Sequence, residues 1–165
     1  MDITYQMNYP SILTDPRCVA LLSELETTRA AFQTLLHSVT ESGWRQKSPS
    51  SAWTVGQVLV HLTWALEHLP EEVENARRGK GMFNMPKRLA DPLSYWYICW
   101  IARTATRESI ARRYDRAMDA STALLATIPD EDWKRGADFY GEGFYSVDDL
   151  FHTPAHHLAE HTSGL

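Results

Sequence analysis

The sequence predicts an all-α protein, a bundle of long amphipathic helices, and three observations support this prediction. In four long segments the apolar residues recur at alternating steps of three and four, which is the period of a helix with one buried face. Residues that favour helix N-termini stand at the start of three of these segments. No segment shows a convincing alternation of apolar and polar residues, so no strand is expected.

The first helix is expected to begin at Asp15 and Pro16, because aspartate caps free amides and proline at the first helical position loses no hydrogen bond. An apolar stripe then runs through residues 18–39. Ser42 and Gly43 end this pattern. The segment from there through residue 50 is rich in turn-forming residues and is expected to be a loop.

The second helix is expected to begin at Thr54, which forms a capping-box pair with Gln57. Apolar residues over 55–69 line one arc of this helix. Pro70 is expected to kink or restart the helix, which then continues to residue 78. Residues 79–92 form the first of two longer connectors.

The third long helix is expected to begin near residues 92–94, to pass through an aromatic cluster and to end at Pro129. The second connector, residues 130–145, contains three glycines and shows no helical period. Ser146 is expected to cap the last helix, which runs to the end of the chain and bends around Pro154. Four helices and two connectors add up to a helical bundle.

Length and composition favour one globular domain over residues 1–165, of 18.8 kDa, with 44% hydrophobic and 22% charged residues. The net charge is −5, which argues against binding to nucleic acid. No apolar run reaches about 18 residues and the amino terminus lacks a secretory signal, so we expect no membrane span and a cytoplasmic location. Cys18 and Cys99 lie far apart without a CxxC spacing, so neither a cysteine zinc site nor a redox motif is expected.

Four of the seven histidines lie in the final segment, at His152, His156, His157 and His161. At about 100° per residue, His157 and His161 lie one turn apart on the apolar side of the predicted helix. His152 and His156 lie on the opposite, acidic side. An inward pair with HxxxH spacing is typical of metal ligands, because a divalent cation supplies the partner that a buried imidazole needs.

A third ligand must come from another segment, and His61 is the best candidate because it borders the apolar arc of the second helix. His68 lies about 10 Å further along, which favours a supporting or structural role, and His37 is expected at the surface. Glu160 and Asp149 either orient the imidazoles or accept a proton, or they only solvate the last helix. If the histidines instead find hydrogen-bond partners in the core, the protein is a metal-free bundle. No HExxH motif is present.

Two blocks of the sequence resemble the DinB-like superfamily, which includes the damage-inducible DinB proteins and the thiol-dependent S-transferases related to mycothiol-dependent maleylpyruvate isomerase. The first block is residues 53–62 (WTVGQVLVHL), and the second is residues 146–152 (SVDDLFH) with 156–161 (HHLAEH). The resemblance implies an antiparallel four-helix bundle with an unusual connection order, which forms a homodimer. It also implies one metal ion, held by His61, His157 and His161.

The expected function is metal-dependent chemistry on a small-molecule substrate. Three neutral imidazoles leave a divalent ion, zinc or nickel, with an open position for water or for a low-molecular-weight thiol. The resemblance implies a thiol S-transferase, and a hydrolase would use the same open position. Candidate pocket walls, or else plain core residues, are Trp64, Tyr95, Trp96 and Trp100. Arg103 is a candidate partner for a carboxylate of the thiol.

The alternative is a non-catalytic bundle that binds a metal or another ligand and serves in a stress response. The enzymatic and the non-catalytic hypotheses predict different surroundings for the metal ion. An enzyme needs a cleft that opens onto the ion, whereas a structural site is closed by a fourth protein ligand.

Overall fold

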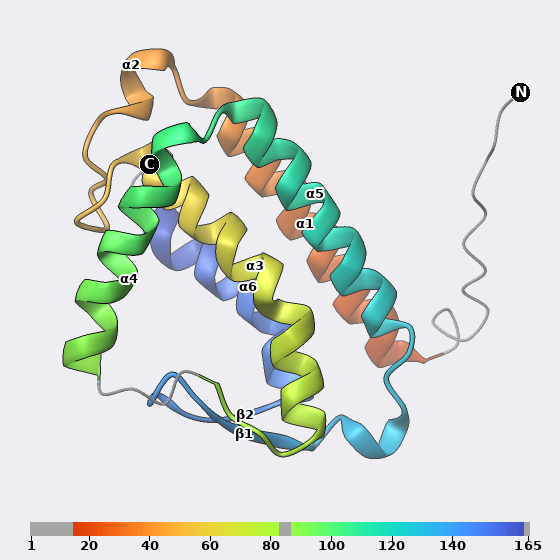
Figure 1. Ribbon diagram of the computed structural model, residues 1–165. Coiled ribbons are helices and arrows are strands. Elements are labelled where there is room, and N and C mark those ends of the chain that lie inside the picture. The colour runs from red at the N-terminus through yellow and green to blue at the C-terminus, as the bar shows by residue number, and fades with distance from the viewer. Residues whose placement is uncertain (1–14, 83–86, 164–165) are drawn as a thin grey trace, which may run out of the picture.

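The structure, a computed structural model, describes residues 15–82 and 87–163 (Figure 1). Within these ranges it has six α-helices and a two-stranded antiparallel sheet. The helices are α1 (Pro16–Ser38), α2 (Glu41–Trp44), α3 (Val55–Arg77), α4 (Lys87–Ile101), α5 (Arg107–Leu125) and α6 (Val147–Thr162), and the strands are β1 (Gly136–Phe139) and β2 (Gly143–Ser146). None of the described helices is long and apolar enough to cross a membrane. The expectation about the amino terminus concerns residues 1–14, which lie outside the described residues.

Four long helices pack around a shared core: α1 and α3 each contact both α5 and α6 (Figure 1). Helices α1 and α6 run in the same direction, since Arg17 pairs with Asp148 near their starts and Glu24 pairs with His152 further along. Helices α3 and α5 both run the opposite way. The α1–α5 and α3–α6 contacts are therefore antiparallel, and the α1–α6 and α3–α5 contacts are parallel. The reason is α4, which carries the chain back so that α5 begins at the same end as α3.

The core between these helices is made of large apolar side chains. Phe32 of α1 and Tyr114 of α5 stack with their ring centroids 3.6 Å apart, and Trp133 packs against Phe151 of α6. Phe32 and Phe151 are fully buried, and burial of one such side chain contributes about 1.5–3 kcal/mol. This core fixes the spacing of α3 and α6, the two helices that carry the candidate metal ligands.

Capping residues set the starts of α3 and α6 as the sequence predicts. The Thr54 hydroxyl accepts a hydrogen bond from the Gln57 backbone amide, and the Gln57 side chain accepts one from the Thr54 amide. Ser146 and Asp149 form the same box at the start of α6. Helix α3 continues through Pro70 without a restart. Both candidate ligand segments therefore lie on unbroken helix.

The prediction of one continuous third helix is wrong. The structure has two helices there, α4 and α5, separated by a 3-10 turn at Ala102–Thr104. The helix is interrupted at Thr106. The Thr106 hydroxyl accepts a hydrogen bond from the Ser109 backbone amide, and the Ser109 hydroxyl accepts one from the Thr106 amide. This third capping box starts a new helix at Arg107. Helix α4 also begins earlier than predicted, at Lys87, and Pro92 lies inside it.

Two of the three segments predicted to be irregular contain short elements. Residues 136–146 form the β1–β2 hairpin, so the expectation of no strand is wrong. Its turn uses Tyr140 at φ 58° and Gly141 at φ 70°, and the Tyr140 hydroxyl donates to the buried Glu72 carboxylate of α3. In the first loop, Thr40 caps the short helix α2. The strand sequences GADF and GFYS show no strict alternation of apolar and polar residues.

Candidate metal centre

Three histidine side chains converge where the start of α3 lies against the end of α6. The Nε2 atoms of His61 and His157 are 2.9 Å apart, and one ligand atom from each of His61, His157 and His161 lies within 4.8 Å of the others. The ring centroids are 4.7–5.0 Å apart. The convergence follows from helix geometry, because residues 157 and 161 lie one turn apart on α6 and α3 runs antiparallel to it. The structure thus brings together the three histidines that the sequence predicts as ligands.

The surroundings keep these imidazoles neutral. Burial lowers the pKa of His61 to about 3, with the neighbouring His157 and His161 as lesser causes. Burial also lowers the pKa of His157 to about 4, and His161 lowers it further. The pKa of His161 is lowered by burial as well, and the charge of Glu160 acts in the opposite direction. At neutral pH all three rings therefore offer a free nitrogen lone pair, which is the form that binds a metal.

The hydrogen bonds of the three imidazoles are also compatible with a bound divalent cation. Among the described residues, the buried Nδ1 atom of His161 has no hydrogen-bond partner; that of His61 has none either, and it would stay unpartnered if Nε2 of the same ring bound the cation. The contact between the Nε2 atoms of His61 and His157 needs one shared proton when no cation is present. Two nitrogens on one tetrahedral zinc ion lie about 3.3 Å apart, so a shift of a few tenths of an ångström would suit both rings. A cation would accept all three lone pairs at once.

An aromatic side chain that the sequence analysis did not single out covers the histidines. The Trp53 ring lies 4.6 Å from His61 and 6.1 Å from His161, centroid to centroid. Tyr95 of α4 lies parallel to Trp53 at 6.3 Å. The Ser50 hydroxyl donates to the backbone carbonyl of His161 at 2.6 Å, which ties the loop before α3 to the end of α6. The available signal was the position of Trp53 directly before the N-cap, where apolar residues often fold back onto the helix.

Gln57 and Cys99 form a second contact between α3 and α4. The Gln57 side-chain amide donates to the Cys99 sulfur at 3.5 Å, and Gln57 lies one turn before His61. A hydrogen bond with Cys99 raises the pKa of Tyr95. These polar groups lie on the side of α4 that faces α3. Gln57 thus links Cys99 of α4 to the turn of α3 before His61, and Tyr95 borders Trp53.

The other histidines lie apart from this cluster. The His68 ring packs on Trp64, and its Nδ1 contacts the Trp64 carbonyl at 2.8 Å, which agrees with a structural role. His152 pairs with Glu24 of α1 at 2.8 Å. His156 is exposed, and His37 is exposed at the end of α1, as expected.

The candidate pocket walls divide into two groups. Tyr95 contacts the Trp53 ring beside the histidines, whereas Trp64 belongs to the His68 contact. Trp96 and Trp100 are 70% and 64% exposed, on the side of α4 away from its buried residue Ile98. These two tryptophans are therefore not core residues, and their place in a substrate pocket stays a prediction. Arg103 is exposed in the turn after α4, and the Asp149 carboxylate accepts a hydrogen bond from the Ser146 amide in the capping box of α6.

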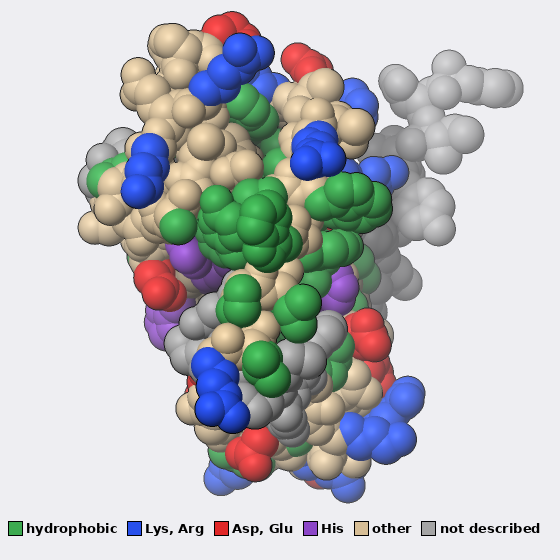
Figure 2. Space-filling model, turned by 60° about the vertical axis from the view of Figure 1, so that its left-hand side comes forward, with side chains coloured by type: hydrophobic (Ala, Val, Ile, Leu, Met, Phe, Trp, Pro, Cys, Tyr) green, Lys and Arg blue, Asp and Glu red, His purple; other side chains and the backbone are tan. Residues whose placement is uncertain are grey.

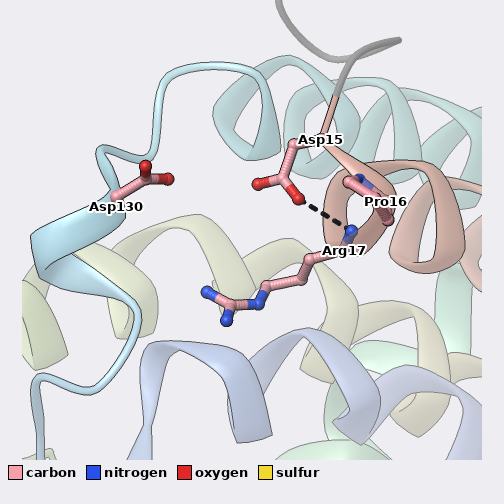
Figure 3. Close-up of a pocket in the computed structure, with 4 residues that line it drawn as sticks. All are labelled: Asp15, Pro16, Arg17 and Asp130. Carbon is pink, nitrogen blue, oxygen red and sulfur yellow. Dashed lines mark hydrogen bonds between the residues drawn. The ribbon is translucent and has the colours of Figure 1, made fainter.

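A cavity of about 420 Å³ lies at the opposite end of α6 from the histidines. Asp15, Pro16, Arg17 and Asp130 line it, and the Asp15 carboxylate accepts a hydrogen bond from the Arg17 amide at 2.8 Å (Figure 3). Arg17 pairs with Asp148 at the start of α6. This position is about 14–20 Å along the helix from the two histidines of α6. The cavity is therefore separate from the candidate metal centre.

Comparison with known proteins identifies the family. No curated protein and no solved structure matches the chain. The model of the DinB superfamily matches residues 24–163, which is most of the chain and includes His61, His157 and His161. The resemblance of the two sequence blocks is thereby confirmed, and the chain belongs to the DinB superfamily.

Proposed function

We propose that this protein is a metal-dependent enzyme that acts on a small molecule, as a thiol S-transferase or as a hydrolase. His61, His157 and His161 would hold one divalent ion, with zinc and nickel as the two candidates. The observation that carries the proposal is the convergence of three neutral, partly buried imidazoles from two helices. We also propose that α1, α3, α5 and α6 constitute the four-helix bundle of the superfamily.

The donor set supports a catalytic site. Structural zinc sites have four protein ligands, whereas catalytic sites have three and an open position. Among the described residues, the one group of histidine, cysteine and acidic side chains close enough to share an ion has three members, all histidines. When bound, a divalent ion would supply Lewis acidity and would lower the pKa of water or of a thiol at that position.

The residues of this chain have separate parts in the proposal. The imidazoles bind the ion, and the ring of Trp53 excludes water from the side of His61 and His161. Tyr95, which lies beside the Trp53 ring, and Gln57, which donates to Cys99, are the candidate contacts for the small molecule.

The second candidate function is a non-catalytic bundle that binds a metal or another ligand. The specific observation in its favour is the cover over the histidines: Trp53 contacts two of the three rings, and Ser50 ties the covering loop to α6. A loop fixed in this way would close the site. The two candidates therefore differ in whether an added small molecule reaches the ion.

Cobalt substitution provides the test, because the visible absorption of Co²⁺ depends on its ligands. The experiment measures the spectrum of the cobalt-loaded protein before and after a low-molecular-weight thiol is added. An accessible open position predicts a saturable change of the spectrum. A closed site predicts an unchanged spectrum, and that result would overturn the enzymatic proposal in favour of the non-catalytic one.

Two variants make this test specific. His161→Ala removes one proposed ligand and is expected to abolish the cobalt spectrum at stoichiometric metal. His156→Ala changes an exposed histidine of the same helix and is expected to retain both the spectrum and its response to thiol. Reaction type is then assigned by assaying the zinc- and nickel-loaded protein with thiols plus electrophiles, and separately with hydrolysable esters and amides.

A further inference from the structure

Three buried nitrogen atoms at the candidate metal centre have no hydrogen-bond partner among the described residues: Nδ1 of His61, Nδ1 of His161 and Nε1 of Trp53. The two histidine atoms belong to rings that would bind the ion. The Trp53 indole is not a metal ligand, because its N–H group is a hydrogen-bond donor only. A buried donor without an acceptor costs free energy, so a molecule that brought an acceptor to this N–H would bind more tightly.

The indole of Trp53 is held in place on several sides. Its ring lies 4.6 Å from His61 and 6.1 Å from His161, centroid to centroid, and parallel to the ring of Tyr95. The backbone is also fixed, because the Trp53 carbonyl accepts a hydrogen bond from the Ser48 amide at 2.9 Å. A donor that is already oriented needs no reorganisation when a ligand arrives.

The other donors near the histidines are engaged or open to water. The Gln57 side-chain amide donates to the sulfur of Cys99, and Tyr95 shares a hydrogen bond with the same cysteine. Figure 2 shows hydrophobic side chains gathered on the outer face of α4, and Trp96 and Trp100 are 70% and 64% exposed there. Water therefore competes for the N–H groups of these two tryptophans. The buried indole N–H is the donor that remains.

The charge of the site favours an anionic acceptor. The lowered pKa values of His61 and His157 keep these rings neutral, and among the described residues no carboxylate belongs to the group that could share the ion. Glu160, whose charge acts on His161, is exposed on α6. A divalent ion held there would keep both of its positive charges, and a buried charge is stabilised by an opposite charge beside it. The open position therefore favours an anion over a neutral molecule.

We propose that Trp53 is a ligand-binding residue, whose indole N–H donates a hydrogen bond to a small anion at the open position of the metal centre. This inference rests on the proposed function, because it needs an ion at His61, His157 and His161. It adds the chemical class of the ligand, an anion that carries a hydrogen-bond acceptor, such as a carboxylate or a thiolate. It also adds a residue that selects this class, because a hydrogen bond to a charged acceptor is stronger than one between neutral groups, and more so where water is excluded.

Cobalt-loaded protein tests the proposal, with azide as the anionic probe and imidazole as the neutral one. Each probe changes the visible spectrum when it binds Co²⁺, so a titration gives its dissociation constant. Trp53→Phe keeps an aromatic ring beside His61 and removes the N–H. It is expected to raise the dissociation constant of azide about 10-fold or more. Cobalt content and the dissociation constant of imidazole are expected to stay the same, because a coordinated imidazole offers no acceptor.

Trp133→Phe is the matched control. The Nε1 atom of Trp133 is also buried without a partner among the described residues, but this ring packs on Phe151 near the start of α6, at the end of the helix away from the histidines. The same substitution there is expected to leave the binding of both probes unchanged. Circular dichroism establishes that both variants are folded.

Proton NMR of the zinc-loaded wild type provides a second measurement that needs no substitution. The indole N–H signal of Trp53 can be assigned through its proximity to the ring protons of His61. This signal is expected to move downfield as azide is added, because a hydrogen-bonded proton is deshielded. The signal of Trp133 is expected to stay in place.

The outcomes separate this inference from the proposed function. If azide binds the wild type and Trp53→Phe equally well, the inference is overturned and the metal centre stands. An equal loss of azide and imidazole binding in this variant would also overturn it, because the effect would not depend on an acceptor. So would a Trp53 signal that stays fixed while azide binds. A wild type that takes up no cobalt, or whose spectrum responds to neither probe, would overturn both the inference and the enzymatic proposal.

Discussion

The histidine cluster makes the stability of the metal-free protein sensitive to acid. In the folded state the pKa of His61 is about 3 and that of His157 about 4, against 6.5 for an ordinary histidine. At pH values between these folded-state pKa values and 6.5, the two histidines bind more protons in the unfolded chain than in the folded protein. The free energy of unfolding therefore falls as the pH falls below about 6.5.

The size of this effect follows from the same pKa values. The slope is about 1.4 kcal/mol per pH unit for each histidine that is protonated only in the unfolded state. Between pH 7.5 and pH 5.0, His61 and His157 are each expected to remove about 2 kcal/mol of stability, or about 4 kcal/mol together. Other groups titrate in this range as well, so the comparison must be made with variants that lack these two rings.

Urea unfolding in the presence of a chelator measures this effect at pH 7.5, 6.5 and 5.0. The double variant His61→Gln with His157→Gln is expected to lose about 4 kcal/mol less than the wild type over this range. His156→Gln, at an exposed position of the same helix, is expected to follow the wild type. An equal loss in the wild type and the double variant would refute the reasoning, because the two imidazoles would then be solvated in the folded protein.

Three further substitutions test the packing that positions the centre, each by urea unfolding at neutral pH. Phe32→Ala removes a fully buried ring stacked on Tyr114 and is expected to cost about 3–5 kcal/mol; a loss below about 1 kcal/mol would contradict this packing. Thr106→Ala removes the cap of α5 and is expected to cost about 1 kcal/mol, whereas no loss would mean that the cap is dispensable. Gly56→Ala places a methyl group against the Trp44 ring and is expected to cost about 1–3 kcal/mol; an unchanged or higher stability would show that the two do not touch.

The starts of α1, α3 and α6 could be predicted from the sequence because local chemistry decides them. Asp15, Thr54 and Ser146 each cap free amides of the following turn, and this signal needs no knowledge of the rest of the fold. The convergence of the histidines was predictable for a related reason. His157 and His161 lie on one face of one helix, and His61 borders the buried face of another.

The features that were missed depend on weaker local signals or on distant contacts. The break before α5 rests on a capping box with Ser109 in place of the usual Glu or Gln, so its signal was faint. The hairpin depends on the contact of Tyr140 with Glu72, which lies 68 residues earlier in the chain. The outward position of Trp96 was not predictable either, because α4 is aromatic on both sides and only packing decides which side is buried.

The relative directions of the helices also required the structure. A sequence gives the length of a connector but not the side on which it returns. Here α4 itself serves as the return, so that α3 and α5 run in the same direction. This arrangement places α4 beside the start of α3, where Tyr95 meets Trp53 next to the histidines.

The central claim is that His61, His157 and His161 hold one metal ion, and metal content tests it most directly. The measurement is elemental analysis of protein purified without a histidine tag, for the wild type and for His61→Ala, His157→Ala and the control His152→Ala. The account predicts about one divalent ion per chain in the wild type and the control, and almost none in the other two variants. A wild type that carries no metal, and takes up none when zinc or nickel is offered, would contradict it.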